Sequence, residues 1–283
     1  MTSSIKRAVR PRVDISSLRE LLPRVIEVAT QAGAAIWDIY QNKFSVSQKS
    51  DCSPVTEADL TANEIIIDGL ARLNPRWPVV SEEESIPDFA LRSKWDYHWL
   101  VDPLDGTREF IKRNDEFTVN IALIHRHRPV LGVIYVPATK VTYYANVRGG
   151  AFKAGPEGNI DRIRARSWDG RHVVVAGSRA YRTGLFEQFL NRFISNEVLS
   201  LGSSLKSCLI AEGGADVYAR FGPTAEWDTA AAQCIVEEAG GRICDLSLRS
   251  LAYNQRPSLT NPSFIVVGDL KHDWSAYLPN LSD

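Results

Sequence analysis

The sequence contains no long hydrophobic run and almost no net charge. Its longest apolar stretch, residues 130–136, is far too short to span a bilayer, so we expect no transmembrane segment. The formal net charge of −1 gives no overall indication of binding to nucleic acid or to an acidic membrane surface. Repeats and low-complexity segments are also absent from the 283 residues, which are enough for one large domain or two lobes.

Cysteine and histidine are too scattered to predict a zinc or disulfide framework. The four cysteines, none of them in a C-x-x-C spacing, are Cys52, Cys208, Cys234 and Cys244. Three lie in apolar surroundings, which is typical of reduced, buried thiols in a cytoplasmic protein. The histidines do not cluster with them, and His125 and His127 fit a hairpin turn between two strands. We therefore expect a cytoplasmic protein.

The N-terminal residues 1–13 carry four basic side chains but are followed by no apolar core, so they do not form a secretory signal. We interpret them as a basic arm, disordered or loosely attached. A solvated tail is the favoured interpretation, and peripheral contact with the cytoplasmic face of the inner membrane is the alternative. Since the chain has neither a basic face nor a nucleic-acid-binding motif, no nucleic acid is expected as a partner.

Hydrophobic periodicity predicts an α+β lobe over residues 14–152. Apolar residues at helical spacing indicate a helix from Asp14 to about Tyr40 and a second from about Thr56 to Leu73. Alternating stretches that indicate antiparallel strands are residues 117–124, 130–136 and 141–147.

A second lobe, of α/β type, is predicted over residues 153–283. The composition turns to Gly, Ala and Pro around residues 149–158, which is where the boundary between the lobes is placed. Beyond it, apolar runs typical of strands alternate with helical patterns as far as Phe264–Val267.

The stretch most informative about function begins where an apolar run, residues 99–101, ends in Asp102-Pro-Leu-Asp-Gly-Thr107. The run indicates a buried strand, and the turn after it presents Asp102 and Asp105 at the strand end. Carboxylates suit a hard divalent cation, which prefers oxygen ligands. Gly106 and Thr107 open a segment of helical character, whose free N–H groups suit a phosphate oxygen. A metal beside a phosphate indicates phosphoryl chemistry.

Other acidic residues also lie at the predicted element edges. Asp59 is in the first turn of the second helix, Glu82 and Glu83 follow a short strand, and Asp228 opens a helix. Each has an ordinary interpretation alone, as a helix cap or a solvated loop. If they converge with Asp102 and Asp105, so many like charges cannot all stay ionised without cations.

These motifs resemble the Mg²⁺-dependent, lithium-sensitive phosphomonoesterases of the inositol monophosphatase superfamily, from about residue 18 to 268. The elements that carry the resemblance are Ser81-Glu-Glu, Asp102-Pro-Leu-Asp-Gly-Thr107, and Trp227-Asp228 followed by Gly240-Gly241. The resemblance implies a layered αβαβα sandwich of the sugar-phosphatase type, with the active site between two lobes. The segments that are similar to the bacterial 3′(2′),5′-bisphosphate nucleotidases (CysQ type) are residues 99–119, Gly202-Ser-Ser-Leu-Lys206 and Arg220-Phe-Gly-Pro-Thr224.

The resemblance also implies roles for individual residues. It maps metal ligation, for roughly two or three Mg²⁺ ions, onto Glu82, Asp102, the Leu104 carbonyl, Asp105 and Asp228. Thr107, oriented by Asp59, would position a metal-activated water and pass on its proton, and Glu83 would support the ligands. The residues that it places against the substrate are Glu82, Leu104, Asp105, Gly106, Thr107, Gly202, Ser203, Lys206, Arg220 and Asp228.

Arg220 separates the nucleotidase from the inositol phosphatase interpretation. Inositol-specific members tend to place an acid near this position, whereas an Arg prefers a second phosphate, which it can hold bidentately. Lys206 and Arg220 would therefore suit a substrate with two phosphates. The alternative is that Arg220 pairs with Glu226 or another acid.

We expect hydrolysis of the 3′-phosphate of adenosine 3′,5′-bisphosphate (PAP) to AMP, with PAPS as a further candidate substrate. An inositol-1-phosphate or sugar monophosphatase is the alternative of the same fold, and a non-catalytic regulatory protein on this scaffold is the alternative of another class. Inhibition by Li⁺ is expected from the resemblance, and a homodimer is compatible with it.

Overall fold

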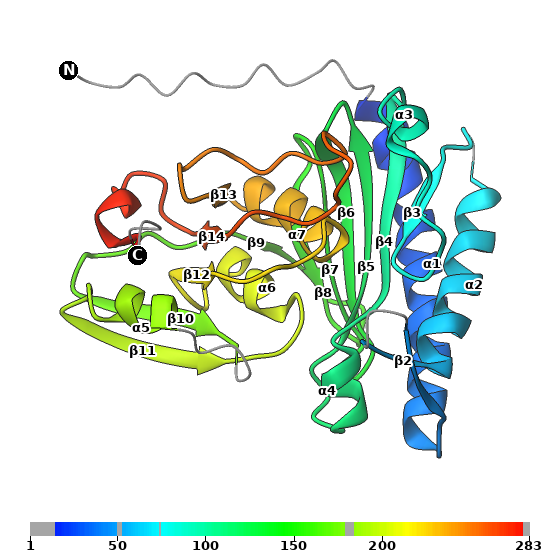
Figure 1. The fold of residues 1–283 in the computed structure, drawn as a ribbon, viewed down its shortest axis with the longest axis horizontal. Coiled ribbons are helices and arrows are strands. Elements are labelled where there is room, and N and C mark those ends of the chain that lie inside the picture. Colours follow the sequence, from blue (N-terminus) through cyan, green and yellow to red (C-terminus); the bar gives the residue numbers. More distant parts are fainter. Residues whose placement is uncertain (1–14, 50–52, 74, 179–183, 280–283) are drawn as a thin grey trace.

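Two β-sheets with helices outside and between them make up the fold (Figure 1). A computed structural model of the protein describes residues 15–49, 53–73, 75–178 and 184–279. The basic arm and Asp14, the expected start of the first helix, lie outside these residues. None of the helices within them is both long enough and apolar enough to cross a membrane.

The first sheet has seven strands, which lie in sequence order from β3 to β9. They are β3 (Val79–Ser81), β4 (Tyr97–Asp105), β5 (Thr118–His125), β6 (Arg128–Val136), β7 (Val141–Asn146), β8 (Gly150–Ala154) and β9 (Ile160–Ile163). Only β3 and β4 pair in parallel. The turn at Arg126 and His127, where φ is positive at both residues, confirms the predicted hairpin between β5 and β6.

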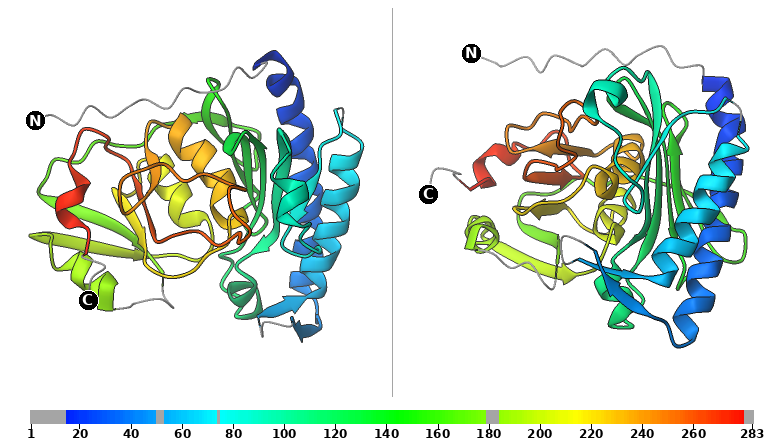
Figure 2. Two further views of the ribbon diagram at one scale, coloured as in Figure 1. Left: turned by 45° about the horizontal axis from the view of Figure 1, so that its top comes forward. Right: turned by 45° about the vertical axis from the view of Figure 1, so that its right-hand side comes forward.

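Helices α1 (Ile15–Gln41) and α2 (Glu57–Ala71) cover the outer face of this sheet, side by side (Figure 2). The predicted apolar stripe of α1, from Leu18 to Tyr40, is buried there. In α2 the apolar spacing predicts an inward Leu60, but this prediction is wrong, because the buried stripe runs through Asp59, Ala62 and Ile66 and leaves Leu60 50% exposed. A polar residue, Asp59, thus lies where periodicity alone favours an apolar one.

The second sheet has five strands in the order β11-β10-β12-β14-β13. They are β10 (His172–Gly177), β11 (Ser195–Ser200), β12 (Val217–Arg220), β13 (Arg242–Asp245) and β14 (Phe264–Val267). Helices α6 (Leu205–Ala211) and α7 (Trp227–Glu238) fill the space between the sheets, whereas α5 (Gly184–Leu190) packs on the far face with the 3₁₀-helix η1 (Trp274–Tyr277). The resulting layers confirm the αβαβα sandwich.

Five short elements were not predicted, and two of them extend the first sheet. Strands β8 and β9 continue it past residue 152, because Gly149 and Gly155 close hairpin turns through bonds to Asn146 O (2.8 Å) and Asn159 O (2.9 Å). The change from one sheet to the other therefore falls between Ile163 and His172. The other three elements are η1, α3 (Phe89–Arg92) and β2 (Pro54–Thr56), which pairs with β1 (Val46–Gln48). The division into two lobes stays an interpretation.

Close packing of β6 against α7 leaves no room for a side chain at Gly132. A Cβ added there would lie 2.4 Å from the backbone oxygen of Ala231 in α7, which cannot yield unless the helix shifts. We expect Gly132→Ala to lower the free energy of unfolding by about 1–3 kcal/mol in urea titrations. The control is Gly184→Ala, where an added Cβ meets no atom within 4 Å. Equal losses in the two variants would contradict the β6–α7 packing.

Candidate active site

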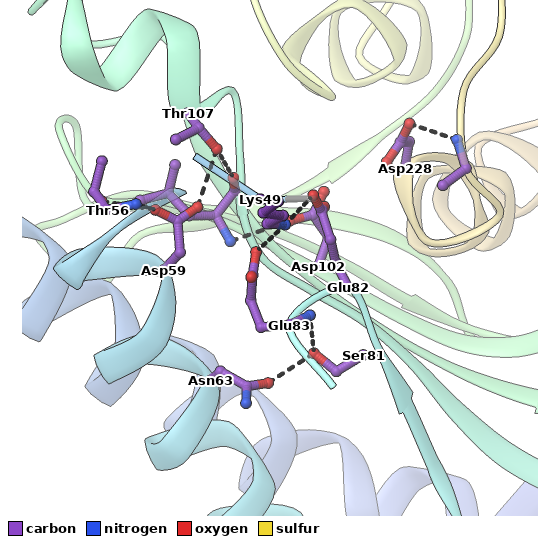
Figure 3. A network of polar contacts seen from close by, with 12 residues as sticks. Lys49, Thr56, Asp59, Asn63, Ser81, Glu82, Glu83, Asp102, Thr107 and Asp228 are labelled. Carbon is purple, nitrogen blue, oxygen red and sulfur yellow. Dashed lines mark hydrogen bonds and ion pairs between the residues drawn. The ribbon is translucent and has the colours of Figure 1, made fainter. Parts of the chain in front are cut away.

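Three carboxylates from distant parts of the chain meet between the first sheet and the start of α7 (Figure 3). Glu82 follows β3, Asp102 lies in β4, and Asp228 is in the first turn of α7. One carboxylate oxygen from each lies within 4.8 Å of the others. Parallel pairing of β3 with β4 brings the first two together, since Glu82 N–H donates to Val101 O at 3.1 Å. We call these three residues the acidic cluster.

A β-bulge turns a second aspartate of β4 toward the same side of the sheet. Residues three apart on a regular strand face opposite sides, but between Asp102 and Asp105 the pairing with β5 shifts by one residue. Leu104 therefore packs with α1 and α2, while Asp105 points toward α6. The expected turn at Asp102–Asp105 is wrong in form, since these residues continue the strand, but both carboxylates reach the site.

The charges of this site are crowded and poorly hydrated. Burial raises the pKa of Asp102 well above its ordinary value, and Glu82, Asp105 and Asp228 raise it further. Burial also raises the pKa of Asp228, with Asp105 and Glu82 as the next causes. Carboxylate oxygens at this spacing are a donor set that fits a hard divalent cation, which would offset the repulsion.

Asp105 and Leu104 have polar partners that orient them. Asp105 Oδ2 accepts from Ser204 Oγ at 2.8 Å and from Asn120 Nδ2 at 3.3 Å. The Leu104 N–H donates to Asp102 Oδ1 at 3.1 Å, and its carbonyl oxygen lies 3.3 Å from Thr107 Oγ1.

Thr107 and Asp59 are brought together as the resemblance implies. Thr107 Oγ1 donates to Asp59 Oδ1 at 3.0 Å. The other oxygen of Asp59 accepts from the N–H (2.8 Å) and the hydroxyl (2.6 Å) of Thr56, in the capping box that starts α2. Burial raises the pKa of Asp59 against the lowering effect of these bonds. Asp59 therefore caps α2 and contacts Thr107 at the same time.

Gly106 lies between Asp105 and the short helix α4 (Thr107–Ile111). Its φ of 96° is in the left-handed region that favours glycine, and an added Cβ would lie 3.0 Å from Glu116 O. No larger residue fits this bend without strain. The bend sets Thr107 at the first position of α4, with its hydroxyl toward Asp59.

Lys49 is the site residue that sequence reasoning missed. Its Nζ contacts Glu82 Oε1 at 2.8 Å and Glu83 Oε1 at 2.6 Å. Burial opposes the charge of Lys49, but the two glutamates outweigh it and raise its pKa. In sequence Lys49 resembles any exposed lysine at a strand end, and only the β1–β2 pairing brings it to the site.

Four predicted substrate residues lie on the side of the second sheet. Lys206 Nζ donates to Ser203 O (2.6 Å) and Leu201 O (3.2 Å), and burial lowers its pKa to about 8. Ser203, with φ of 42°, has a buried hydroxyl. Gly202 N–H donates to Glu116 Oε2 at 2.8 Å, so this N–H has a partner other than substrate.

Arg220 ends β12 and donates through Nη2 to Pro223 O at 3.1 Å. Glu226, its expected alternative partner, is fully buried and accepts from Asn254 N–H at 2.7 Å. A hollow of about 480 Å³ opens nearby, walled by Pro223, Thr224, Ala225, Trp227, Ile86, Pro257, Leu259 and Thr260. Ala225 N–H donates to Asp228, so the hollow adjoins the acidic cluster and gives room for the organic part of a phosphate ester.

Comparison with known proteins agrees with this geometry. The sequence profile of the inositol monophosphatase family matches residues 17–273. The chain is 46% identical to the 3′(2′),5′-bisphosphate nucleotidase CysQ of Salmonella typhimurium and 45% identical to that of Escherichia coli, over 87% of this chain and 99% of each relative.

Among solved structures, CysQ of Bacteroides thetaiotaomicron superposes with a TM-score of 0.77 at 40% identity, covering 88% of this chain and 97% of that one. The IMPase of Thermotoga maritima gives a TM-score of 0.73 at 25% identity, covering 91% and 95%. The profile spans most of the chain, and the relatives match it nearly end to end. The chain therefore belongs to the inositol monophosphatase family.

Proposed function

We propose that the protein is a Mg²⁺-dependent phosphatase that removes the 3′-phosphate from adenosine 3′,5′-bisphosphate, with PAPS as a further candidate substrate. The observation that carries the proposal is the acidic cluster beside the Thr107–Asp59 pair. The names of the CysQ relatives support the choice of substrate. The acidic cluster, the Thr107–Asp59 pair and these names together favour hydrolysis of a bisphosphorylated nucleotide.

The residues that would hold the metal are Glu82, Asp102, Asp105, Asp228 and the Leu104 carbonyl. Hard oxygen donors on a mostly buried site suit Mg²⁺. When bound, Mg²⁺ supplies positive charge that lowers the pKa of water and offsets the charge of the phosphate. Lys49 already neutralises part of the charge of Glu82 and Glu83, so Glu83 supports the site through Lys49.

Thr107 and Asp59 would position the attacking water. The hydroxyl hydrogen of Thr107 points to Asp59 Oδ1, which leaves the lone pairs of Oγ1 to accept a hydrogen bond from water. The buried carboxylate of Asp59, whose pKa is raised, is suited to receive the proton that Thr107 passes on.

Lys206 and Arg220 would hold the phosphate that is not cleaved. Lys206 uses two contacts to fix the backbone at Leu201 and Ser203, and an ammonium has three donors. The guanidinium of Arg220 offers a planar fork suited to a phosphate. Lys206 lies in α6 and Arg220 ends β12, on the second-sheet side of Asp105.

Several further properties rest on the resemblance. We propose that Li⁺ inhibits the enzyme and that roughly two or three Mg²⁺ ions bind per site. A cytoplasmic location and a homodimer stay predictions, and contact of residues 1–13 with the inner membrane stays the alternative to a solvated tail.

Phosphate release in the presence of Mg²⁺ tests the proposal directly. We expect adenosine 3′,5′-bisphosphate to be hydrolysed with a higher kcat/KM than inositol 1-phosphate or fructose 1,6-bisphosphate, and chelation of Mg²⁺ to stop the reaction. Equal or greater efficiency on inositol 1-phosphate would refute the nucleotidase assignment and favour the sugar phosphatase.

Loss of one proposed ligand charge should nearly abolish turnover. We expect Asp105→Asn to lower kcat by roughly 100-fold or more, because the amide cannot replace a charged metal ligand. The control is Asp161→Asn on the exposed strand β9, which should keep full activity. Retained activity of Asp105→Asn would overturn the proposed ligand set.

The second-phosphate role predicts a split between substrates for Arg220→Ala. Loss of charged hydrogen bonds should raise KM for adenosine 3′,5′-bisphosphate by roughly 10- to 100-fold and change KM for 3′-AMP much less. Arg171→Ala, which changes an exposed arginine just before β10, is the matched control. If Arg220→Ala raises both KM values equally, Arg220 does not contact the second phosphate.

A further inference from the structure

The peptide unit between Thr224 and Ala225 orients the carboxylate of Asp228. The N–H of Ala225 donates to Asp228 Oδ2 at 2.9 Å. The carbonyl of the same peptide unit, that of Thr224, accepts from the N–H of Asn261 at 2.8 Å. The two bonds polarise each other through the peptide, so the backbone of Asn261 and the carboxylate of Asp228 are linked in a single chain.

The side chain of Asn261 strengthens this link. Its Nδ2 lies 2.6 Å from Ala225 O, 3.0 Å from Thr229 Oγ1 and 3.2 Å from Thr224 Oγ1. The side chain is 6% exposed, so water competes little for these contacts. Asn261 therefore contacts the chain on both sides of Asp228, at residues 224–225 and at Thr229.

The other end of the loop that carries Asn261 is fastened by a buried charged network. The carboxylate of Glu226, next to Trp227-Asp228, accepts from Asn254 N–H at 2.7 Å. Asn254 in turn donates through Nδ2 to Arg92 O at 2.7 Å, and the guanidinium of Arg92 donates to Asn254 Oδ1. All three residues are at most 1% exposed.

Arg92 ties this loop to the first-sheet side of the molecule. It lies in α3, between β3 and β4, and its guanidinium also donates to Arg256 O at 3.0 Å and to Pro257 O. The first residues of this loop thus contact α3, which lies in the connection between β3 and β4. Asn261, at the other end of the loop, contacts the residues at the start of α7. A buried arginine and glutamate are costly to desolvate, and an apolar replacement is often as stable. Their presence here calls for a role beyond stability.

We propose that residues 254–261 form a clamp that presets Asp228 for metal binding, with Asn261 as its positioning residue and Glu226, Asn254 and Arg92 as its anchor. The proposal rests on the proposed function, since it concerns the same metal site. Mutual repulsion favours rotation of Asp228 away from Glu82 and Asp102. The bond from Ala225 N–H opposes that rotation and keeps the three acids within 4.8 Å.

The clamp is tested by the affinity of metal-stripped protein for Mn²⁺, measured by calorimetry without substrate. We expect Asn261→Ala to weaken binding of at least one ion by roughly 10- to 100-fold, the usual effect of losing a group that orients a ligand. Tyr143→Phe is the control, because it removes a hydrogen bond to Glu212 (3.0 Å) at the C-terminal end of α6. It should lower the melting temperature and leave Mn²⁺ affinity unchanged.

A double-variant cycle shows whether Asn261 acts through Asp228. In the Asp228→Asn background, Asn261→Ala should weaken Mn²⁺ binding no further, since the two residues are coupled. Asn254→Ser loosens the anchor and should also weaken Mn²⁺ binding. It replaces Asn261→Ala as the test if that variant does not fold. Unchanged affinity in these variants, or equal losses with and without Asp228, would overturn the clamp alone. A wild-type protein that binds no Mn²⁺ would overturn the clamp and the proposed function together.

Discussion

Repulsion among Glu82, Asp102 and Asp228 is the constraint on which the surrounding structure depends. Their oxygens lie within 4.8 Å of one another, and burial raises the pKa of Asp102 and Asp228. Such a group is stable only if its charge is offset and its members are held in place. Lys49 supplies part of the offset through its ion pair with Glu82.

Each carboxylate is held in place by a different local feature of the fold. The bulge in β4 turns Asp105 toward the site that Asp102 already faces, and the capping box of α2 fixes Asp59. Asp228 is held through Ala225 by the loop of residues 254–261. Because these features lie in different layers of the fold, the site forms only when the layers have packed together. This explains why its residues are spread from Lys49 to Asn261.

The sequence predicts the parts of the site that are local and misses those that depend on long-range contact. Acidic residues at strand ends and helix starts mark Glu82, Asp102 and Asp228, since strand and helix boundaries can be read from periodicity. Lys49 and Asn261 carry no such signal, because their partners lie 32 or more positions away in the chain. The same holds for β8 and β9, whose glycine-rich turns resemble a linker until strand pairing is seen. The bulge in β4 depends on the register of a neighbouring strand, which composition does not encode.

The central claim is that cations complete the acidic cluster, and a direct count of bound metal tests it. Metal-stripped protein is dialysed against Mn²⁺ and the bound ions are counted per chain. The account predicts more than one ion per chain at saturation, with fewer when Asp102 is replaced by Asn. Absence of bound ions at millimolar Mn²⁺, in protein that remains folded, would contradict it.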